Sequence, residues 1–189
     1  MKISYNWLKW YIPEIPEANL PNANKLRDTL TYHLTEVEGV YIHDHKHRSL
    51  QSIPDPYYND YDPDIDYILD VNILPNRAHD LLSHSGVARE LSGQLGILFI
   101  DPAKTYTDII AKKEIQKTNL SIDVRTENCR RFTARIIRNI KVGPSPEWVV
   151  KHLESIGSRT INNIVDATNL VMFNCGQPTH RSEERRVGK

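Results

Sequence analysis

Residues 67–77 read Y-I-L-D-V-N-I-L-P-N-R. This stretch combines the pattern of a β-strand with a proline that ends the strand. Apolar side chains occupy every second position from Tyr67 to Ile73, which is the period of a strand with one buried face. Pro75 cannot donate to a strand ladder. The sequence therefore predicts a strand over 67–73 that ends before the P-N-R triplet.

Helical patterns lie on either side of this strand. Leu26, Leu30 and Leu34 recur at the helical period and predict a helix over 22–37. A similar apolar stripe predicts a second helix over 79–95. Helix, strand and helix are therefore predicted to follow one another over residues 22–95.

Two segments lack any period. Residues 41–64 are rich in aspartate and proline and are predicted to be an acidic connector within an N-terminal domain of residues 1–100. Residues 101–118 are polar and irregular and are predicted to be a linker. A second domain is then expected over 119–180.

Strands followed by helices are expected in this second domain. L-S-I-D-V-R-T (120–126) and C-R-R-F-T-A-R-I-I-R-N-I (129–140) predict two strands. Ser145 is a predicted N-cap for a helix that stops at Gly157, and a final helix is expected over 161–173. Without regular β-α-β alternation, the predicted class of the whole chain is α+β.

Composition favours a globular cytoplasmic protein. The 189 residues carry 24 Lys plus Arg against 24 Asp plus Glu, and 39% are hydrophobic. No apolar run is long enough to span a membrane, and Cys129 and Cys175 are predicted to be buried thiols in a reducing compartment. Acidic residues dominate 36–70 and basic residues dominate 121–163, so only the second half is suited to a polyanion.

Few motifs point to chemistry. Phosphate loops, dinucleotide fingerprints, serine-hydrolase elbows and C-x-x-C pairs do not occur in the sequence. His43, His45 and His47 alternate and could face one side of an extended segment, which would suit a metal. The acidic, cysteine-free surroundings favour a solvated tract, and no metal site is predicted.

A more informative cluster is R-T-I-N-N-I-V-D-A-T-N (159–169) followed by G-Q-P-T-H (176–180). Hydroxyl, amide and imidazole groups together could orient a water and a carbonyl in a hydrolytic pocket without a covalent nucleophile. A capped helix with a hydrogen-bonded polar seam explains the same residues. The chemistry of the residues leaves both alternatives open.

Four separated motifs resemble the β subunit of bacterial phenylalanyl-tRNA synthetase, in that family's order. They are K-I-S-Y-N-W-L-K-W-Y-I (2–12), L-T-E-V-E-G-V (34–40), I-L-P-N-R-A-H-D-L-L-S-H-S-G-V-A-R-E-L (73–91) and the 159–180 cluster. The resemblance implies a small N-terminal α+β domain made from residues 1–41 and closed by the segment 65–98. It implies that the second domain is the truncated start of an α+β editing domain of the B3/B4 type. It also implies that Thr168, Asn169 and His180, with Arg159 as a weaker neighbour, fall on editing-pocket positions.

The same resemblance implies a function. The chain would be a fragment of a phenylalanine–tRNA ligase β subunit, which supports charging of tRNA(Phe) by an α subunit and hydrolytic editing of tyrosyl-tRNA(Phe). A pocket shaped for phenylalanine rejects tyrosine poorly, which makes a second, hydrolytic site useful. ATP and magnesium are expected mainly on the α subunit, and this chain is expected to carry no catalytic residue for aminoacylation.

The sequence departs from the family pattern in two places. The connector at 41–64 stands where the family usually carries an OB-fold tRNA-binding insertion. The charged peptide R-S-E-E-R-R-V-G-K (181–189) stands where a buried A-F-D strand is expected, and we predict that it is a non-native tail. The alternative function is a stand-alone RNA- or protein-binding module derived from that subunit.

Overall fold

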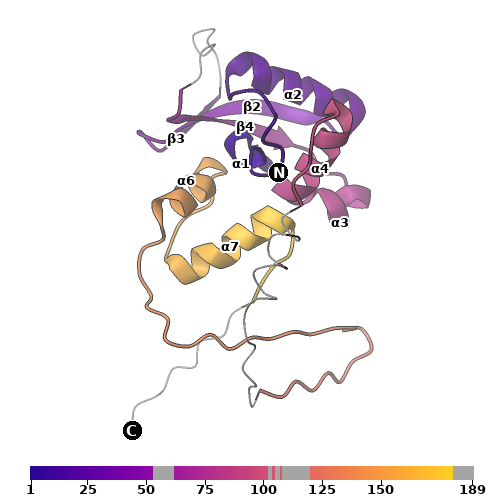
Figure 1. Cartoon of the computed structure of the whole chain (residues 1–189), viewed down its shortest axis with the longest axis vertical. Coiled ribbons are helices and arrows are strands. Elements are labelled where there is room, and N and C mark those ends of the chain that lie inside the picture. Colours follow the sequence, from indigo (N-terminus) through magenta and orange to yellow (C-terminus); the bar gives the residue numbers. More distant parts are fainter. Residues whose placement is uncertain (53–61, 102–103, 105–106, 108–119, 181–189) are drawn as a thin grey trace. The chain divides into compact units, whose positions relative to one another are not determined.

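The computed structural model describes residues 1–52, 62–101, 104, 107 and 120–180 (Figure 1). The chain forms two compact units, Met1–Asp101 together with the residues from Gly143 onward, and Pro102–Val142. The helices and strands of the first unit follow one another as β1 (Lys2–Ser4), α1 (Tyr5–Leu8), α2 (Leu20–His33), β2 (Val37–Asp44), β3 (Ser49–Ser52), β4 (Ile65–Val71), η1 (Pro75–Arg77), α3 (Ala78–Leu81), α4 (His84–Leu95), α6 (Glu147–Ser155) and α7 (Asn163–Cys175). The α+β class predicted from the sequence is confirmed.

A four-stranded sheet in the order β1-β4-β2-β3 forms the centre of the first unit. Every neighbouring pair is antiparallel, with Ile3 opposite Leu69 and His43 opposite Asp66. The strand predicted over 67–73 is therefore present, two residues earlier than expected. β4 is one of the two interior strands, and its buried residues supply both faces of the sheet.

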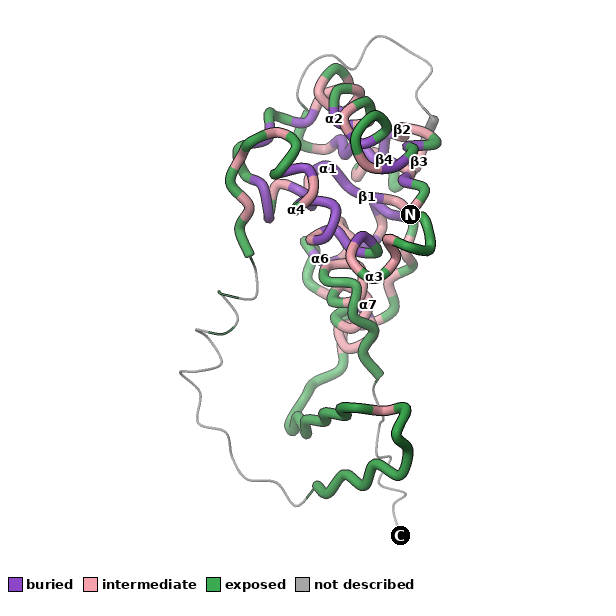
Figure 2. Tube along the Cα trace, turned by 90° about the vertical axis from the view of Figure 1, so that its right-hand side faces the viewer, coloured by how far each residue is buried: buried purple, intermediate pink, exposed green. Residues whose placement is uncertain are grey.

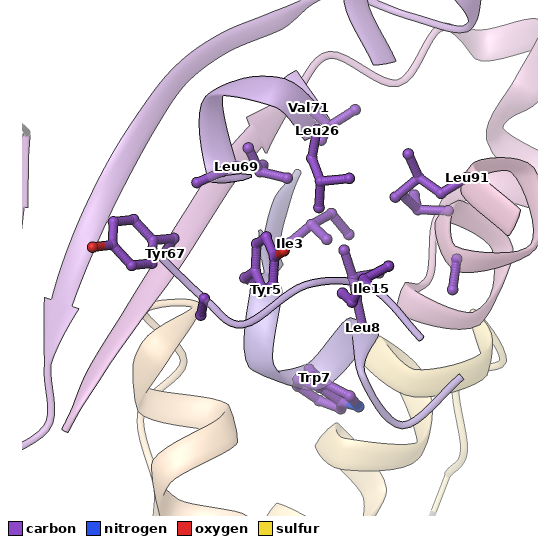
Figure 3. Packing of buried hydrophobic residues seen from close by; sticks show 14 of the residues in the cluster. Ile3, Tyr5, Trp7, Leu8, Ile15, Leu26, Tyr67, Leu69, Val71 and Leu91 are labelled. Atoms are coloured by element: carbon purple, nitrogen blue, oxygen red, sulfur yellow. The ribbon is translucent and has the colours of Figure 1, made fainter. Parts of the chain in front are cut away.

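One face of the sheet carries the hydrophobic core. Ile3, Leu69 and Val71 are fully buried together with Leu26 of α2 and Leu91 of α4 (Figure 3). Further buried side chains of the same core come from α1 and the chain after it, and from α2, β2, α4 and α6. Burial of this apolar surface is the main stabilising contribution to such a small unit.

The first long helix begins and ends earlier than the predicted 22–37. Asn19 is its N-cap, with a side-chain oxygen that accepts a hydrogen bond from Asn22 N at 2.9 Å. Leu34 leaves the helical conformation, and Val37 pairs with Val71 in the sheet instead. Because a bulge interrupts β2 at Val37 and Gly39, this strand lacks the clean alternation that sequence analysis looks for.

The acidic connector predicted over 41–64 is partly wrong. β2 extends to Asp44 and β3 covers Ser49–Ser52, so a hairpin occupies the first half of that segment. Residues 53–61 lie outside the described residues. Short strands in polar surroundings carry a weak sequence signal, and only pairing with a neighbour defines them.

The helix predicted over 79–95 is two helices, α3 and α4. Ser83 separates them as the N-cap of α4, since its hydroxyl accepts from Gly86 N at 3.0 Å. Gly86 also lets the backbone of α3 come very close, because an added Cβ would lie 1.8 Å from Asp80 O. Gly96 ends α4 in the left-handed conformation.

The polar face of the sheet is covered by α6. Asp66, 2% exposed, lies on this face and accepts hydrogen bonds from Ser4 Oγ at 2.6 Å and from Asn6 N at 3.1 Å. Ser155 at the end of α6 also bonds the Asp66 carboxylate. Figure 2 shows buried residues running from the sheet into α6.

Residues 120–142 contradict the two strands predicted over 120–126 and 129–140. The segment is extended and exposed without strand pairing, and Cys129 is its only half-buried residue before Gly143 (Figure 2). Apolar alternation alone does not make a strand, because an isolated pair of strands is marginally stable without a sheet or helix to pack on. Apolar side chains such as Ile137, 69% exposed, therefore remain uncovered.

The last two helices differ in detail from the prediction. Pro146, not Ser145, is the N-cap residue of α6, and Ser145 Oγ instead donates to Asp166 of α7 at 2.5 Å. α7 covers 163–175, two residues later than predicted. Contacts group α6 and α7 with Met1–Asp101, whereas sequence analysis grouped them with 119–142. None of the helices in the described part of the chain is both long and apolar enough to cross a bilayer.

Candidate functional site

Two of the predicted editing residues, Thr168 and Asn169, lie side by side in the middle of α7. Both are half-buried. Thr168 Oγ1 donates to Val165 O at 2.6 Å, so its hydroxyl hydrogen is turned back onto its own helix. Thr168 and Asn169 are thus neighbouring polar side chains in the middle of α7.

Other polar residues of the 159–169 motif have structural roles. Asn162 caps α7, with its side-chain oxygen 3.0 Å from both Ile164 N and Val165 N. Asp166 is 1% exposed and accepts from Ile161 N at 2.8 Å and from Ser145. The capped helix with a polar seam is therefore the correct account of Asn162 and Asp166.

The C-terminal end of α7 is fastened to the N-terminal segment. Trp7 Nε1 donates to Asn174 Oδ1 at 2.8 Å, and the Tyr11 hydroxyl donates to the same oxygen. One amide oxygen thus satisfies two donors from the α1 region. Figure 3 shows Trp7 at the edge of the core that lies next to α7.

His84 makes a second link at the same end of α7. Its Nε2 accepts from Ser4 N at 3.1 Å, so Nδ1 carries the hydrogen and donates to Phe173 O at 2.9 Å. The imidazole stacks on Trp7 with ring centroids 4.0 Å apart. Burial lowers the pKa of His84 to about 3, because the interior disfavours the charged ring.

The structure does not bring all four predicted site residues together. Arg159 precedes α7 and His180 follows it, and the 13 residues of the helix rise by roughly 20 Å. Arg159 lines a hollow with His43 and Glu154 on the polar face of the sheet. Its assignment to the same pocket as His180 stays a prediction without support from this geometry.

His180 follows the turn at Gly176, whose φ of +76° takes the chain out of α7. The side chain is exposed. A hydrolytic pocket needs a general base within hydrogen-bond reach of the attacking water. The role of His180 beside Thr168 and Asn169 stays a prediction.

Sequence analysis did not assign roles to the residues that position α7. His84 and Trp7 lie inside motifs quoted for the family resemblance, yet their periodicity carries no hint of a partner. Their two hydrogen bonds to Phe173 and Asn174 span 89 and 167 residues of sequence. These contacts could have been predicted only from information that relates positions far apart in the sequence.

Neither the histidine triplet nor the cysteines form a site. His43 is 3% exposed, with its ring 4.8 Å from that of His45, while His47 Nδ1 lies 2.5 Å from Asp44 Oδ2. Among the described residues, no three His, Cys, Asp or Glu side chains gather closely enough to hold a metal ion. The prediction that Cys175 is buried is wrong, because it is exposed at the end of α7.

Comparison with known proteins matches this region to a described family. Residues 128–183 match the family model described as "B3/4 domain", which spans α6, α7 and His180. This match supports an editing-type domain in the second half of the chain.

Similarity to curated proteins extends further along the chain. The chain is 42% identical over 120 residues to the phenylalanine–tRNA ligase beta subunit of Clostridium tetani. It is 37% identical over 126 residues to that of Rhodopirellula baltica, and 41% identical over 115 residues to that of Geobacter sulfurreducens. These alignments cover 64%, 67% and 61% of this chain and 15%, 18% and 14% of the relatives. By sequence the chain is thus a relative of the phenylalanine–tRNA ligase beta subunits, and it spans less than a fifth of their length.

Proposed function

We propose that this chain acts as part of a phenylalanine–tRNA ligase beta subunit, and that its α6–α7 region contributes to hydrolytic editing of tyrosyl-tRNA(Phe). The observation that carries the proposal is the B3/4 domain match over residues 128–183, which contains Thr168, Asn169 and His180. In this role Thr168 and Asn169 would hold the terminal ribose and ester carbonyl of the tRNA. His180 would place the attacking water, with Arg159 as a weaker candidate.

The anchoring of α7 supports this assignment. An editing pocket needs its polar groups held in a fixed geometry, and rigid elements hold them better than loops. Asn174 receives two hydrogen bonds from the α1 region, and His84 binds the carbonyl of Phe173. These contacts fix the helix that carries Thr168 and Asn169.

In this proposal, a partner α subunit in the cytoplasm would charge tRNA(Phe) with phenylalanine. ATP and magnesium would be bound mainly by that subunit, and this chain would contribute no catalytic residue to aminoacylation. Its N-terminal sheet and helices would serve as a body that supports the editing region.

A chimera tests the editing role. Residues 1–180 would replace the matching segment of the Clostridium tetani beta subunit, co-expressed with its α subunit. We expect the double variant T168A/N169A to lose about tenfold or more of tyrosyl-tRNA(Phe) deacylation, while formation of phenylalanyl-tRNA(Phe) is unchanged. The matched control is V171A, an exposed position on the same helix. Equal deacylation by the double variant and by V171A would contradict the proposed site.

The 189-residue chain by itself is expected to edit poorly. Thr168 and Asn169 are half-buried on α7 and His180 is exposed beyond it. Release of tyrosine from tyrosyl-tRNA(Phe) would be measured against the uncatalysed rate. Rapid deacylation by this chain would refute the expectation.

One observation favours the alternative of an RNA-binding module. The extended segment 120–142 exposes basic residues, including Arg130, Arg131, Arg135 and Arg138. Such a segment would bind RNA through phosphate contacts, and its affinity would fall steeply with salt. Tight binding of unrelated RNA that weakens on neutralising Arg135 and Arg138 would favour this module over a subunit role.

A further inference from the structure

A hollow on the polar face of the sheet is lined by groups from three elements. It has a volume of about 260 Å³, and its lining residues are His43, Arg48, Glu154, Gly157, Ser158 and Arg159. His43 belongs to β2, Arg48 to the β2–β3 turn, and the others to the end of α6 and the chain after it. Sequence analysis assigned these residues no joint role.

Positive charge dominates the hollow. Arg48 and Arg159 both line it and are exposed. Lys2 adds a third cation, because its Nζ lies 3.8 Å from where a Cβ on Gly157 would be. Glu154 is the one acidic lining residue, and Arg48 lies 3.6 Å from its carboxylate. Within the described part of the chain, Arg159 makes no ion pair.

His43 supplies the second, independent observation. Its side chain is 3% exposed, and its buried Nδ1 has no hydrogen-bond partner among the described residues. Leaving such a group unpaired is costly, which makes an unpaired buried nitrogen rare in folded proteins. Burial lowers the pKa of His43, so the ring is neutral near pH 7 and one nitrogen bears a hydrogen that can be donated.

The backbone keeps the hollow open. Gly157 adopts φ +79° as α6 ends, and its N–H donates to Glu154 O while Ser158 N donates to Leu153 O. Without a side chain at Gly157, the space beside Lys2 stays clear. Ser158 also lines the hollow, and its hydroxyl can act as a neutral donor.

We propose that this hollow, formed by Arg48, Ser158 and Arg159 around His43, binds a phosphate group. Guanidinium forks pair with phosphate oxygens in bidentate geometry. Donors that converge from a strand, a turn and a helix end suit a tetrahedral anion with four oxygens better than a flat carboxylate. The phosphate can be free or part of an RNA backbone, and the proposal does not depend on the editing role.

Phosphate titration of the full 189-residue chain tests the site. Inorganic phosphate would be added at constant ionic strength while the imidazole resonances of His43 are followed by NMR. We expect saturable shifts with a millimolar dissociation constant, and at least fivefold weaker binding for R159Q. The matched control is R27Q, which neutralises an exposed arginine on α2 far along the sequence from the hollow. Circular dichroism would verify that both variants fold, and R48Q provides a second lining variant.

A second arm distinguishes the source of the phosphate. Binding of a ten-nucleotide RNA that R159Q weakens and R27Q leaves unchanged would assign a backbone phosphodiester. Saturable binding of inorganic phosphate alone, with the same dependence on Arg159, would assign a free phosphate. Absence of His43 shifts at 20 mM phosphate, or equal loss in R159Q and R27Q, would overturn the proposal.

Discussion

Two buried polar side chains, Asp66 and His84, join β1 to the helices that lie far along the sequence. Asp66 accepts hydrogen bonds from Ser4 and Asn6 and is also bonded by Ser155 of α6. His84 accepts from Ser4 N and donates to Phe173 O. Each residue holds a structural role through hydrogen bonds, so each is costly to replace by an apolar group.

Asp66 makes stability depend on pH. Burial raises the pKa of Asp66 to about 6, so the folded state holds the proton more tightly than the unfolded chain. The stabilisation is complete below the unfolded pKa and is lost as pH rises through about 6. We expect the free energy of unfolding of D66N, relative to wild type, to increase by about 2–3 kcal/mol between pH 4 and pH 7.

Urea unfolding at a series of pH values measures this difference. His43, opposite Asp66, shifts in the other direction, and subtracting wild type from D66N removes its contribution. The exposed E38Q on β2 serves as control. A D66N difference that stays flat with pH, as in the control, would show that the pKa of Asp66 is the same in the folded and unfolded states.

Replacing His84 by phenylalanine separates stacking from hydrogen bonding. H84F keeps an aromatic ring against Trp7 but loses both hydrogen bonds and leaves Ser4 N without its acceptor. We expect a loss of about 3 kcal/mol in the free energy of unfolding near pH 7. Chemical denaturation would measure this loss. The control is H79A, since the side chain of His79 is 78% exposed, and we expect it to change the free energy of unfolding by under about 0.5 kcal/mol.

The pH dependence of H84F has a definite sign. The pKa of His84 is lowered to about 3, so wild type holds this stabilisation above about pH 6.5 and loses it as pH falls toward 3. The gap between wild type and H84F should therefore narrow in acid. A gap that widens in acid would mean that the folded protein binds a proton at His84 more tightly than the unfolded chain does.

At the scale of elements, periodicity predicted the helices and the strand whose apolar residues repeat regularly. It missed the strands that are defined by pairing with residues far away in the sequence. Leu26 and Leu30 face the core as expected, and the bounds predicted for β4 are within two residues of those observed. The bulged β2 escaped notice because its apolar residues do not alternate. The prediction of strands over 120–140 is wrong for the converse reason. Apolar and polar residues alternate in this segment, but it pairs with no other strand among the described residues. Thr168 and Asn169 could be placed on a helix, but not the anchors of that helix at His84 and Trp7.

Two glycines in α4 should respond oppositely to alanine. A Cβ at Gly86 would lie 1.8 Å from the backbone oxygen of Asp80, whereas a Cβ at Gly93 meets nothing within 4 Å. We expect G86A to destabilise the chain by about 3 kcal/mol or more through overpacking against α3. G93A should stabilise it by about 0.5–1 kcal/mol, because alanine is the better helix former.

Thermal unfolding of both variants would decide this. The two substitutions are chemically identical and lie on one helix, so helix propensity cancels in the comparison. A lower unfolding midpoint for G86A and a raised one for G93A are expected. Equal midpoints would show that α3 and α4 do not approach each other closely at Gly86.

The first unit as a whole is discontinuous in sequence, which no local pattern could reveal. Its two stretches are held together by side chains on both, including Trp10 and Trp148 with ring centroids 5.6 Å apart. Trp10 also lies 4.3 Å from the ring of His152. These contacts belong to one folding unit, although sequence analysis set its boundary between them.

Because the first unit is discontinuous, we expect it to fold without the intervening residues 102–142. Replacing them with a Gly–Ser linker of about 20 residues gives a flexible chain with a reach of roughly 25 Å. The shorter loop also lowers the entropy cost of closure by about 0.6 kcal/mol. We expect the midpoint of thermal unfolding to stay within about 3 °C of wild type.

All 3 tryptophans, Trp7, Trp10 and Trp148, lie in the first unit, so intrinsic fluorescence reports on its folding alone. The same linker chain with N174A serves as control, because it leaves the indole of Trp7 without its acceptor and should lower the midpoint. If the linker chain unfolds more than 10 °C below wild type, residues 102–142 stabilise the first unit directly. The expected result is that the linker chain has the same unfolding midpoint as wild type, and that N174A in the linker chain lowers this midpoint. The contact between Met1–Asp101 and α7 would then depend on the side chains at their interface, and residues 120–140 would contribute nothing to its stability.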